Sequence, residues 1–246
     1  MVSGPQCPDD ALLLIAHGAR RHAGAARLVQ VHAAALRDER HFAEVAVGLL
    51  DGTPSARDAL EGLSSHIVHV VPFFMESGWF VREAVPRALQ AGQGHVLHYH
   101  QPVGLHPDLA GLAATRVQRR CGHDSGRFSV LLAGHGSARA PGRSMTLHRH
   151  AETLSARRCF ARVCAAFLEE PPFIADMLCS WRTMPVAVVG FFAGEGGHVR
   201  DDVPALLGAE RAARGSAGAP LLDLGVIADD PEMPRIILDQ VSGRCT

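Results

Sequence analysis

The chain has 246 residues, of which 47% are hydrophobic, enough to form one large or two small domains with their own cores. Its formal net charge of -1 gives no electrostatic reason to expect nucleic acid as a partner. No apolar run reaches the length of a membrane span, and the first residues lack a signal-peptide pattern. We therefore expect a cytoplasmic protein with no membrane partner, and a monomer.

Short apolar runs alternate along the chain with segments of helical periodicity. In chain order the pattern predicts strand 11–16, helix 21–40, strand 42–50, helix 53–63, strand 66–74, helix 80–89, strand 95–100, helix 107–119, strand 129–133, helix 146–156, strand 161–168, helix 171–179, strand 185–192, helix 198–207, strand 221–226 and helix 233–241. A polar linker is expected at 121–127 and a Gly/Ala loop at 211–219. Strands that alternate with helices form parallel sheets covered on both faces, so we expect an α/β fold.

The chain also contains the same unit twice. A shift of 118 positions carries residues 70–89 onto 188–207, residues 13–18 onto 131–136, and Leu50-Asp51 onto Leu168-Glu169. Three separate blocks share this offset without gaps, which indicates a tandem repeat. We therefore predict two units, at 9–121 and 128–246, each with a four-stranded parallel sheet, facing each other across a cleft.

Polar side chains follow three predicted strands of the second unit. His135, Glu169 and His198 each stand just beyond a strand end, and such ends cluster at one edge of a parallel sheet. Two imidazoles and a carboxylate suit a divalent first-row metal such as Co, Ni, Fe or Zn, and three protein ligands leave one coordination position open. The alternative is a hydrogen-bonded polar cluster that holds the loops together.

The first unit lacks one member of this trio. It has His17 and Asp51 at the corresponding positions, but Phe80 stands where the second unit has His198. A phenyl ring has no nitrogen with which to bind a metal or accept a proton. The metal site is therefore expected in the second unit alone. The six cysteines form no CxxC pair, which disfavours an iron–sulfur cluster or a structural zinc site.

Three motifs of the second unit resemble one protein family. LLAGHGS at 131–137, AFLEEPPF at 166–173 and VVGFFAGEGGHVRDDVP at 188–204 resemble the class II tetrapyrrole chelatases. The similarity is to the CbiX-like sirohydrochlorin cobaltochelatase and ferrochelatase family, in its long two-unit form. The segment GLHPDLAGL at 104–112 resembles the same family, so the likeness extends to both halves.

The resemblance implies an enzyme that inserts Co²⁺ or Fe²⁺, with Ni²⁺ as a further candidate, into sirohydrochlorin in cobalamin or siroheme biosynthesis. It implies no ATP and no organic cofactor. In that family His135 and His198, with Glu169, would hold the metal and help to remove the pyrrole protons. Guanidinium groups bind carboxylates bidentately, so a polycarboxylate macrocycle would suit arginines at the rim of the site. The candidates for substrate binding are Arg139, Arg143, Arg200 and His17, with Arg20 and Arg82 opposite.

Two alternatives remain open at this point. One is a carrier of metal or tetrapyrrole that has the same fold but no turnover. The other is an unrelated metal-dependent lyase or hydrolase that uses the same trio, although the sequence has no nucleophile elbow or phosphate loop in its support.

Overall fold

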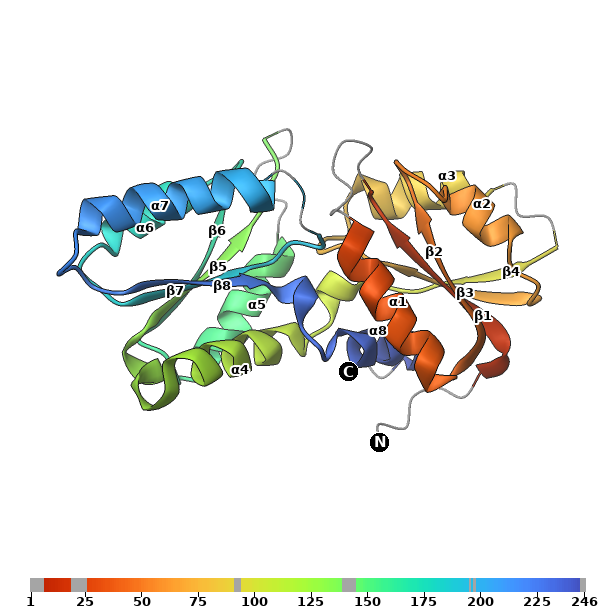
Figure 1. Cartoon of the computed structure of the whole chain (residues 1–246), viewed down its shortest axis with the longest axis horizontal. Helices are drawn as coiled ribbons and strands as arrows, with labels where there is room; N and C mark the ends of the chain where they lie inside the picture. Colours follow the sequence, from red (N-terminus) through yellow and green to blue (C-terminus); the bar gives the residue numbers. More distant parts are fainter. Residues whose placement is uncertain are drawn as a thin grey trace. The chain divides into compact units, whose positions relative to one another are not determined.

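A computed structural model describes residues 7–18, 26–90, 94–138, 145–194, 196 and 198–243, with residues 198 and 199 described by their backbone alone. Its strands form two four-stranded sheets, with strand orders β2-β1-β3-β4 and β6-β5-β7-β8 (Figure 1). All pairings within both sheets are parallel. The predicted α/β fold of two four-stranded units is confirmed, and the cleft between them stays a prediction.

The first sheet has its longest strand at its centre. Residues Leu12 to Ile15 of this strand are fully buried, as expected of a parallel strand covered on both faces. The strands are β1 (Cys7–Ala16), β2 (Phe42–Leu49), β3 (Ile67–Pro72) and β4 (Val96–Tyr99). The helical segments that follow them are α1 (Arg27–Glu39), α2 (Ala56–Glu61), a π-helical turn (Phe80–Ala84), α3 (Val85–Leu89) and a 3-10 turn (Val103–Leu105).

The second sheet repeats this order. Its strands are β5 (Ser129–Gly134), β6 (Arg162–Phe167), β7 (Val186–Gly190) and β8 (Leu221–Val226). Its helical segments are α5 (Met145–Ala156), α6 (Ile174–Ser180), a π-helical turn (His198–Asp202), α7 (Val203–Arg214) and a 3-10 turn (Ile227–Asp229). Two further helices, α4 (Leu109–Cys121) and α8 (Met233–Ser242), follow β4 and β8.

The register of the two sheets follows the sequence repeat. Ile15 pairs with Pro72 in the first sheet, and the residues 118 positions later, Ala133 and Gly190, pair in the second. The two π-helical turns obey the same shift. A residue of one unit can therefore be compared directly with its equivalent in the other.

Helices α4 and α8 are exchanged between the two units (Figure 1). The first unit comprises the described residues up to His106 together with 193–196 and those from Asp230 onward, so it contains α8. The second comprises the rest and contains α4. The predicted unit boundaries at 121 and 128 come from the sequence repeat. In the described structure, the main segment of the first compact unit instead ends at His106, and the second unit begins at Pro107. A repeat identifies equivalent segments, but it does not say which sheet each helix covers.

Side-chain contacts fasten each exchanged helix to its unit. In the first unit, the Gln240 side chain on α8 donates a buried hydrogen bond of 2.9 Å to the Pro102 carbonyl. In the second, Arg116 on α4 donates to the carbonyl of Val226 at 2.7 Å and pairs with Asp229 at 2.6 Å. The apolar face of α8 is fully buried at Met233, Ile236 and Ile237.

Some predicted boundaries differ from those observed. β1 begins at Cys7, and α7 continues to Arg214, into the segment predicted to be a loop. The predicted linker forms a 3-10 turn, Gly122–Arg127, that directly continues α4. Among the described residues, no helix has both the length and the hydropathy needed to cross a membrane.

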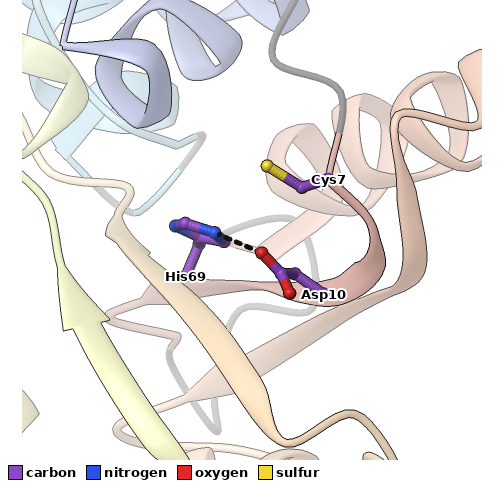
Figure 2. Close-up of side chains that lie close together, drawn as sticks. All are labelled: Cys7, Asp10 and His69. Atoms are coloured by element: carbon purple, nitrogen blue, oxygen red, sulfur yellow. Dashed lines mark hydrogen bonds and ion pairs between the residues drawn. The ribbon is translucent and has the colours of Figure 1, made fainter.

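The start of the first sheet carries a polar cluster of Cys7, Asp10 and His69 (Figure 2). An Asp10 carboxylate oxygen lies 3.1 Å from Nε2 of His69, which joins β1 to β3. Burial and the adjacent Asp10 carboxylate raise the pKa of the Cys7 thiol.

Candidate metal-binding site

The backbone places His135 beside Glu169 at the carboxyl edge of the second sheet. Past the end of the β5–β6 ladder, the amide of Leu168 donates to the Gly134 carbonyl at 3.1 Å, and the amide of Glu169 donates to the His135 carbonyl at 3.0 Å. The side chains then meet, with Nδ1 of His135 3.8 Å from a carboxylate oxygen of Glu169. Their exposed fractions are 46% and 40%, so a ligand can reach both groups from solvent.

Gly136 allows this close approach of the two loops. Its φ of +74° lies in the left-handed region, which glycine adopts at little cost. A β-carbon at this position would lie 2.8 Å from Cβ of Phe167 and 2.8 Å from Cγ of Glu170. Any other residue would therefore push the loop that carries His135 away from the loop that carries Glu169.

The contacts of His135 favour one ring nitrogen for metal binding. Its Nδ1 lies 3.0 Å from the Gly136 carbonyl oxygen, which can only accept a hydrogen bond. A proton on Nδ1 satisfies this contact and leaves the lone pair on Nε2. Metal-binding histidines commonly have this arrangement, in which the second ring nitrogen donates to a carbonyl or carboxylate.

His198 is the first residue of the π-helical turn that precedes α7. Its side chain lies outside the described part of the structure, but the first unit shows the equivalent pair of positions. There the rings of His17 and Phe80 are in contact, with centroids 4.5 Å apart. The repeat therefore indicates that position 198 lies close to position 135. Short π-helical segments are rare and occur frequently at functional sites.

A buried histidine packs under this edge in both units, and sequence reasoning assigned it no role. His150 on α5 contacts Phe191 with ring centroids 5.3 Å apart, and the equivalent pair His32 and Phe73 is 5.8 Å apart. The signal in the sequence is the helical spacing of His150 with the buried residues Leu147, Ala151 and Leu154. Because the pair is present in the unit that lacks the trio, we interpret it as support for the loop after the third strand.

Glu170 is a second residue that the sequence analysis passed over. It follows Glu169 directly, yet its side chain is 1% exposed and packs against Gly136. The two adjacent glutamates therefore differ in role, because Glu169 faces solvent whereas Glu170 fills the space behind the turn.

The predicted substrate-binding residues are only partly described. Arg139, Arg143 and Arg20 lie outside the described residues. Arg200 and its equivalent Arg82 are exposed, and each is the third residue of a π-helical turn. His17 is exposed at the end of β1, as His135 is at the end of β5.

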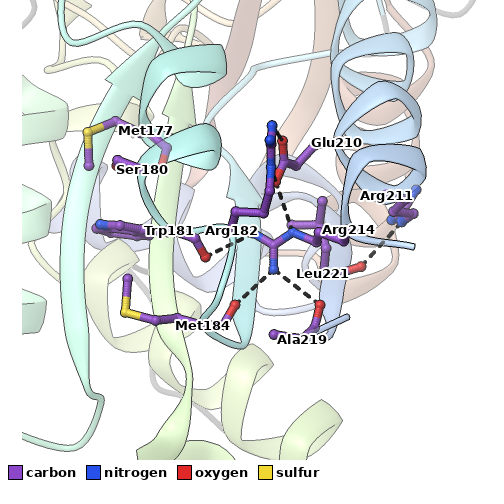
Figure 3. Close-up of polar contacts among 10 residues, drawn as sticks. All are labelled: Met177, Ser180, Trp181, Arg182, Met184, Glu210, Arg211, Arg214, Ala219 and Leu221. Carbon is purple, nitrogen blue, oxygen red and sulfur yellow. Dashed lines mark hydrogen bonds and ion pairs between the residues drawn. The ribbon is translucent and has the colours of Figure 1, made fainter. Parts of the chain in front are cut away.

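A cluster of arginines and one glutamate anchors α7, the helix that continues from His198 (Figure 3). The buried Glu210 carboxylate accepts from Arg182 at 2.8 and 3.1 Å and from Arg214 at 3.1 Å. Arg214 also donates to carbonyls of the segment that leads into β7, those of Trp181 and Met184. The hydrogen bonds from Arg182 chiefly hold the pKa of Glu210 below its usual range.

Two parallel sheets with a histidine and a glutamate at one edge define a two-unit chelatase-like fold. A solved structure from Deinococcus radiodurans, DR2241, is reported as a multi-domain protein with structural similarity to chelatases. It matches 95% of this chain with a TM-score of 0.80 and 25% identity, and this chain spans 54% of its length. Our chain belongs to the CbiX family, whose model matches residues 11–120 and 129–243. The family predicted from the three motifs is thus confirmed.

Several proteins similar to this chain have names that refer to tetrapyrrole metabolism or to a bound metal. A probable sirohydrochlorin cobaltochelatase of Halobacterium salinarum is 27% identical over 219 residues, covering 79% of this chain and 75% of that protein. A CbiX structure, reported as the terminal enzyme of siroheme biosynthesis in denitrifying bacteria, matches with a TM-score of 0.72 and 25% identity over 96% of this chain and 100% of that one. SirB from Bacillus subtilis with Fe³⁺ has a TM-score of 0.79 at 15% identity, over 97% and 96% of the two chains, and shares the fold.

Proposed function

We propose that this protein is a sirohydrochlorin chelatase that inserts Co²⁺ or Fe²⁺ into sirohydrochlorin or a related tetrapyrrole without ATP. The reaction belongs to cobalamin or siroheme biosynthesis. Membership of the CbiX family, and relatives described as a probable sirohydrochlorin cobaltochelatase and as the terminal enzyme of siroheme biosynthesis, support the reaction class. The second unit carries the reaction, with the metal bound by His135, Glu169 and His198.

The observation that carries this proposal is the contact between His135 and Glu169 at the carboxyl edge of the second sheet. Ligands of open α/β sheets bind at this edge. In the first unit, the equivalent third position has Phe80, whose ring contacts His17. Replacing that phenyl ring by the imidazole of His198 provides the second nitrogen ligand.

The chemistry of metal insertion fits these residues. The incoming divalent cation replaces two pyrrole N–H protons of the macrocycle, and both protons must leave. A neutral imidazole can bind the cation through its lone pair, or accept a proton near neutral pH once the cation has moved on. The exposed Glu169 carboxylate adds negative charge that attracts the cation and can pass protons to solvent.

Arginines supply the contacts for the carboxylates of the macrocycle. Arg200 projects from the π-helical turn that begins at His198, and Arg139 and Arg143 follow His135 in the sequence. We assign these three to the substrate rim in the second unit, with His17, Arg20 and Arg82 as further candidates in the first unit. Bidentate guanidinium–carboxylate pairs would orient the ring as well as hold it.

The first experiment follows the absorbance of sirohydrochlorin under anaerobic conditions with Co²⁺, Fe²⁺ and Ni²⁺ in turn. The wild type is compared with His198→Phe, which gives the second unit the residue found at position 80. We expect catalytic conversion by the wild type and a conversion rate lower by about 100-fold or more in the variant. Removing a metal ligand should cost more than removing a residue that only orients a ligand. His123→Asn is the matched control, because His123 is an exposed histidine on the turn before β5.

Two results would contradict parts of the proposal. Equal turnover by His198→Phe and wild type, or Co²⁺ affinity unchanged in both His135→Ala and His198→Ala by calorimetry, would remove the assignment of the site. Conversion that stops at one equivalent per protein would instead indicate a carrier of metal or tetrapyrrole.

A further inference from the structure

A group of cysteine, aspartate and histidine side chains, all of types that can ligate metals, lies at the opposite end of β1 from His17. Cys7 and Asp10 belong to β1 and His69 to β3, and one ligand atom of each lies within 4.8 Å of the others. Figure 2 shows the three side chains gathered together, with the Asp10 carboxylate joined to the His69 ring. Six residues of extended strand, 11–16, separate Asp10 from His17, a distance of roughly 20 Å. The cluster is therefore separate from the carboxyl edge of the first sheet.

The spacing of these atoms suits a small cation. Tetrahedral coordination with bonds of about 2.0–2.3 Å places ligand atoms roughly 3.3–3.8 Å apart. Nε2 of His69 and the carboxylate oxygen of Asp10 are 3.1 Å apart, so a small outward movement admits an ion between them. The Cys7 sulfur lies within 4.8 Å of both atoms, so it has to approach by at most about 1 Å on the same geometry. The β1–β2 register is broken between Cys7 and Ala11, and such an irregularity allows the end of the strand to adjust.

The surroundings of His69 resemble those of a metal-bound imidazole. Its second ring nitrogen, Nδ1, lies 2.9 Å from Nε2 of His100, so the ring is held at both nitrogens. Metal-binding histidines commonly donate a hydrogen bond from the nitrogen that does not bind the metal, and an unprotonated Nε2 of His100 can accept it. The side chains of His69 and Asp10 are 12% and 21% exposed, which shelters the site yet leaves it open to ions.

We propose that Cys7, Asp10 and His69 form a second metal site, which binds a divalent cation of the zinc and cobalt class with water as its fourth ligand. One sulfur, one nitrogen and one oxygen donor favour these borderline cations over magnesium or calcium. Binding forms the metal–thiolate bond and releases the thiol proton to solvent. This site contains none of the residues of the proposed chelatase trio, so an experiment can reject either proposal without rejecting the other.

The alternative is an ion pair that simply fastens β1 to β3. Asp10 and His69 alone would serve that purpose, and such a pair needs no thiol beside it. The two interpretations differ in a measurable way, because only a metal site takes up a cation through the sulfur of Cys7.

The test titrates the full-length, chelator-treated protein with Co²⁺ under reducing conditions and records the sulfur-to-cobalt charge-transfer band in the near ultraviolet. The chelatase trio contains no sulfur and cannot produce this band. We expect the band in the wild type and its loss in Cys7→Ser. Cys179→Ser is the matched control, because Cys179 is an exposed thiol on α6 and would be the first to bind cobalt adventitiously. His69→Gln should retain the thiol but weaken Co²⁺ binding at least tenfold.

Circular dichroism of each variant verifies that it is folded. Absence of the band in the folded wild type would overturn the proposal, as would a band that persists in Cys7→Ser. A band lost only in Cys179→Ser would place the cobalt elsewhere and would also overturn it. Loss of chelatase activity in His198→Phe with the band retained would show that the two sites are independent.

Discussion

At the scale of single residues, the two units differ most informatively at positions 80 and 198. The Phe80 ring occupies the place beside His17 that the repeat assigns to His198 beside His135. Asp51 follows β2 as Glu169 follows β6, and its amide donates to the His17 carbonyl at 2.8 Å. The first unit therefore lacks one imidazole but keeps the backbone arrangement of the site.

This difference predicts that Phe80→His creates a further metal site. The new imidazole would lie beside His17 and near Asp51, which completes a trio like that of the second unit. We expect one additional equivalent of Co²⁺ in equilibrium dialysis, bound more weakly than at the second unit because aspartate is shorter than glutamate. Phe80→Leu, which provides no ligand, should leave the stoichiometry at the wild-type value, and an unchanged stoichiometry in Phe80→His would contradict the equivalence of the two edges.

His100 should make the metal-free protein sensitive to mild acid. Burial, with the neighbouring His69 and His98, lowers its pKa to about 4 from an ordinary value of 6.5. The unfolded chain then binds more protons than the folded one between these values, so stability is complete above about pH 6.5 and is lost as the pH falls toward 4. Denaturant unfolding with a chelator should show a shallower pH dependence for His100→Gln, whereas His123→Gln should behave as wild type.

The sequence reveals those site residues that follow strand ends, because the carboxyl ends of parallel strands share an edge. His135 and Glu169 are such residues, and the structure brings them together. His150 is different, since its importance depends on packing against Phe191, which lies far away in the sequence. The helical spacing of His150 places it on the buried face of α5, but no local pattern shows that its ring packs against Phe191.

At the scale of elements, the two π-helical turns have a local cause. Helices were expected over 80–89 and 198–207, and the structure has a wider first turn in both. The Val85 amide bonds to the Phe80 carbonyl five residues earlier. Pro86 follows and has no N–H to donate, and its ring is incompatible with a close carbonyl four residues earlier. Pro204 stands at the equivalent position, so this feature could have been inferred from the two prolines.

The anchor of α7 predicts the effect of Glu210→Gln. The substitution leaves the guanidinium of Arg214, which is 2% exposed, without its carboxylate partner. We expect the free energy of unfolding to fall by about 2 kcal/mol or more at neutral pH. Thermal and denaturant unfolding would measure this loss.

The same anchor should weaken in acid. Arg182 chiefly, with Arg214, depresses the pKa of Glu210, so the stabilisation is present above the unfolded value of about 4.3 and disappears as the pH falls through the lower folded value. The difference between wild type and Glu210→Gln should therefore shrink below about pH 4. A difference independent of pH would indicate that shape rather than charge is responsible.

At the scale of the whole molecule, the exchanged helices determine what can fold alone. A fragment of residues 1–121 lacks α8, whose residues Met233, Ile236, Ile237 and Leu238 are at most 1% exposed. Each buried side chain contributes about 2 kcal/mol, and together they approach the total stability of a small domain. The repeat alone suggests the opposite, that a cut in the 121–127 segment separates two complete domains.

We therefore expect neither 1–121 nor 128–246 to unfold cooperatively when expressed alone. Co-expression should restore a complex with the circular dichroism and melting transition of the intact chain. Substitutions on α8 give a finer measurement, because Ile236→Ala and Ile237→Ala should destabilise the first unit by about 2–5 kcal/mol. If fragment 1–121 folds alone with full stability, the claim that the first unit needs α8 would be refuted.

The exchange also has a consequence for inheritance. When a gene is duplicated and one copy loses its active residues, deletion of that copy ordinarily costs the organism little. Here the first copy encodes α4, whose buried face at Leu109, Ala113 and Val117 covers the second unit. Deleting the first copy would therefore remove a helix that covers the second unit, so selection for the activity proposed for the second unit would retain both copies.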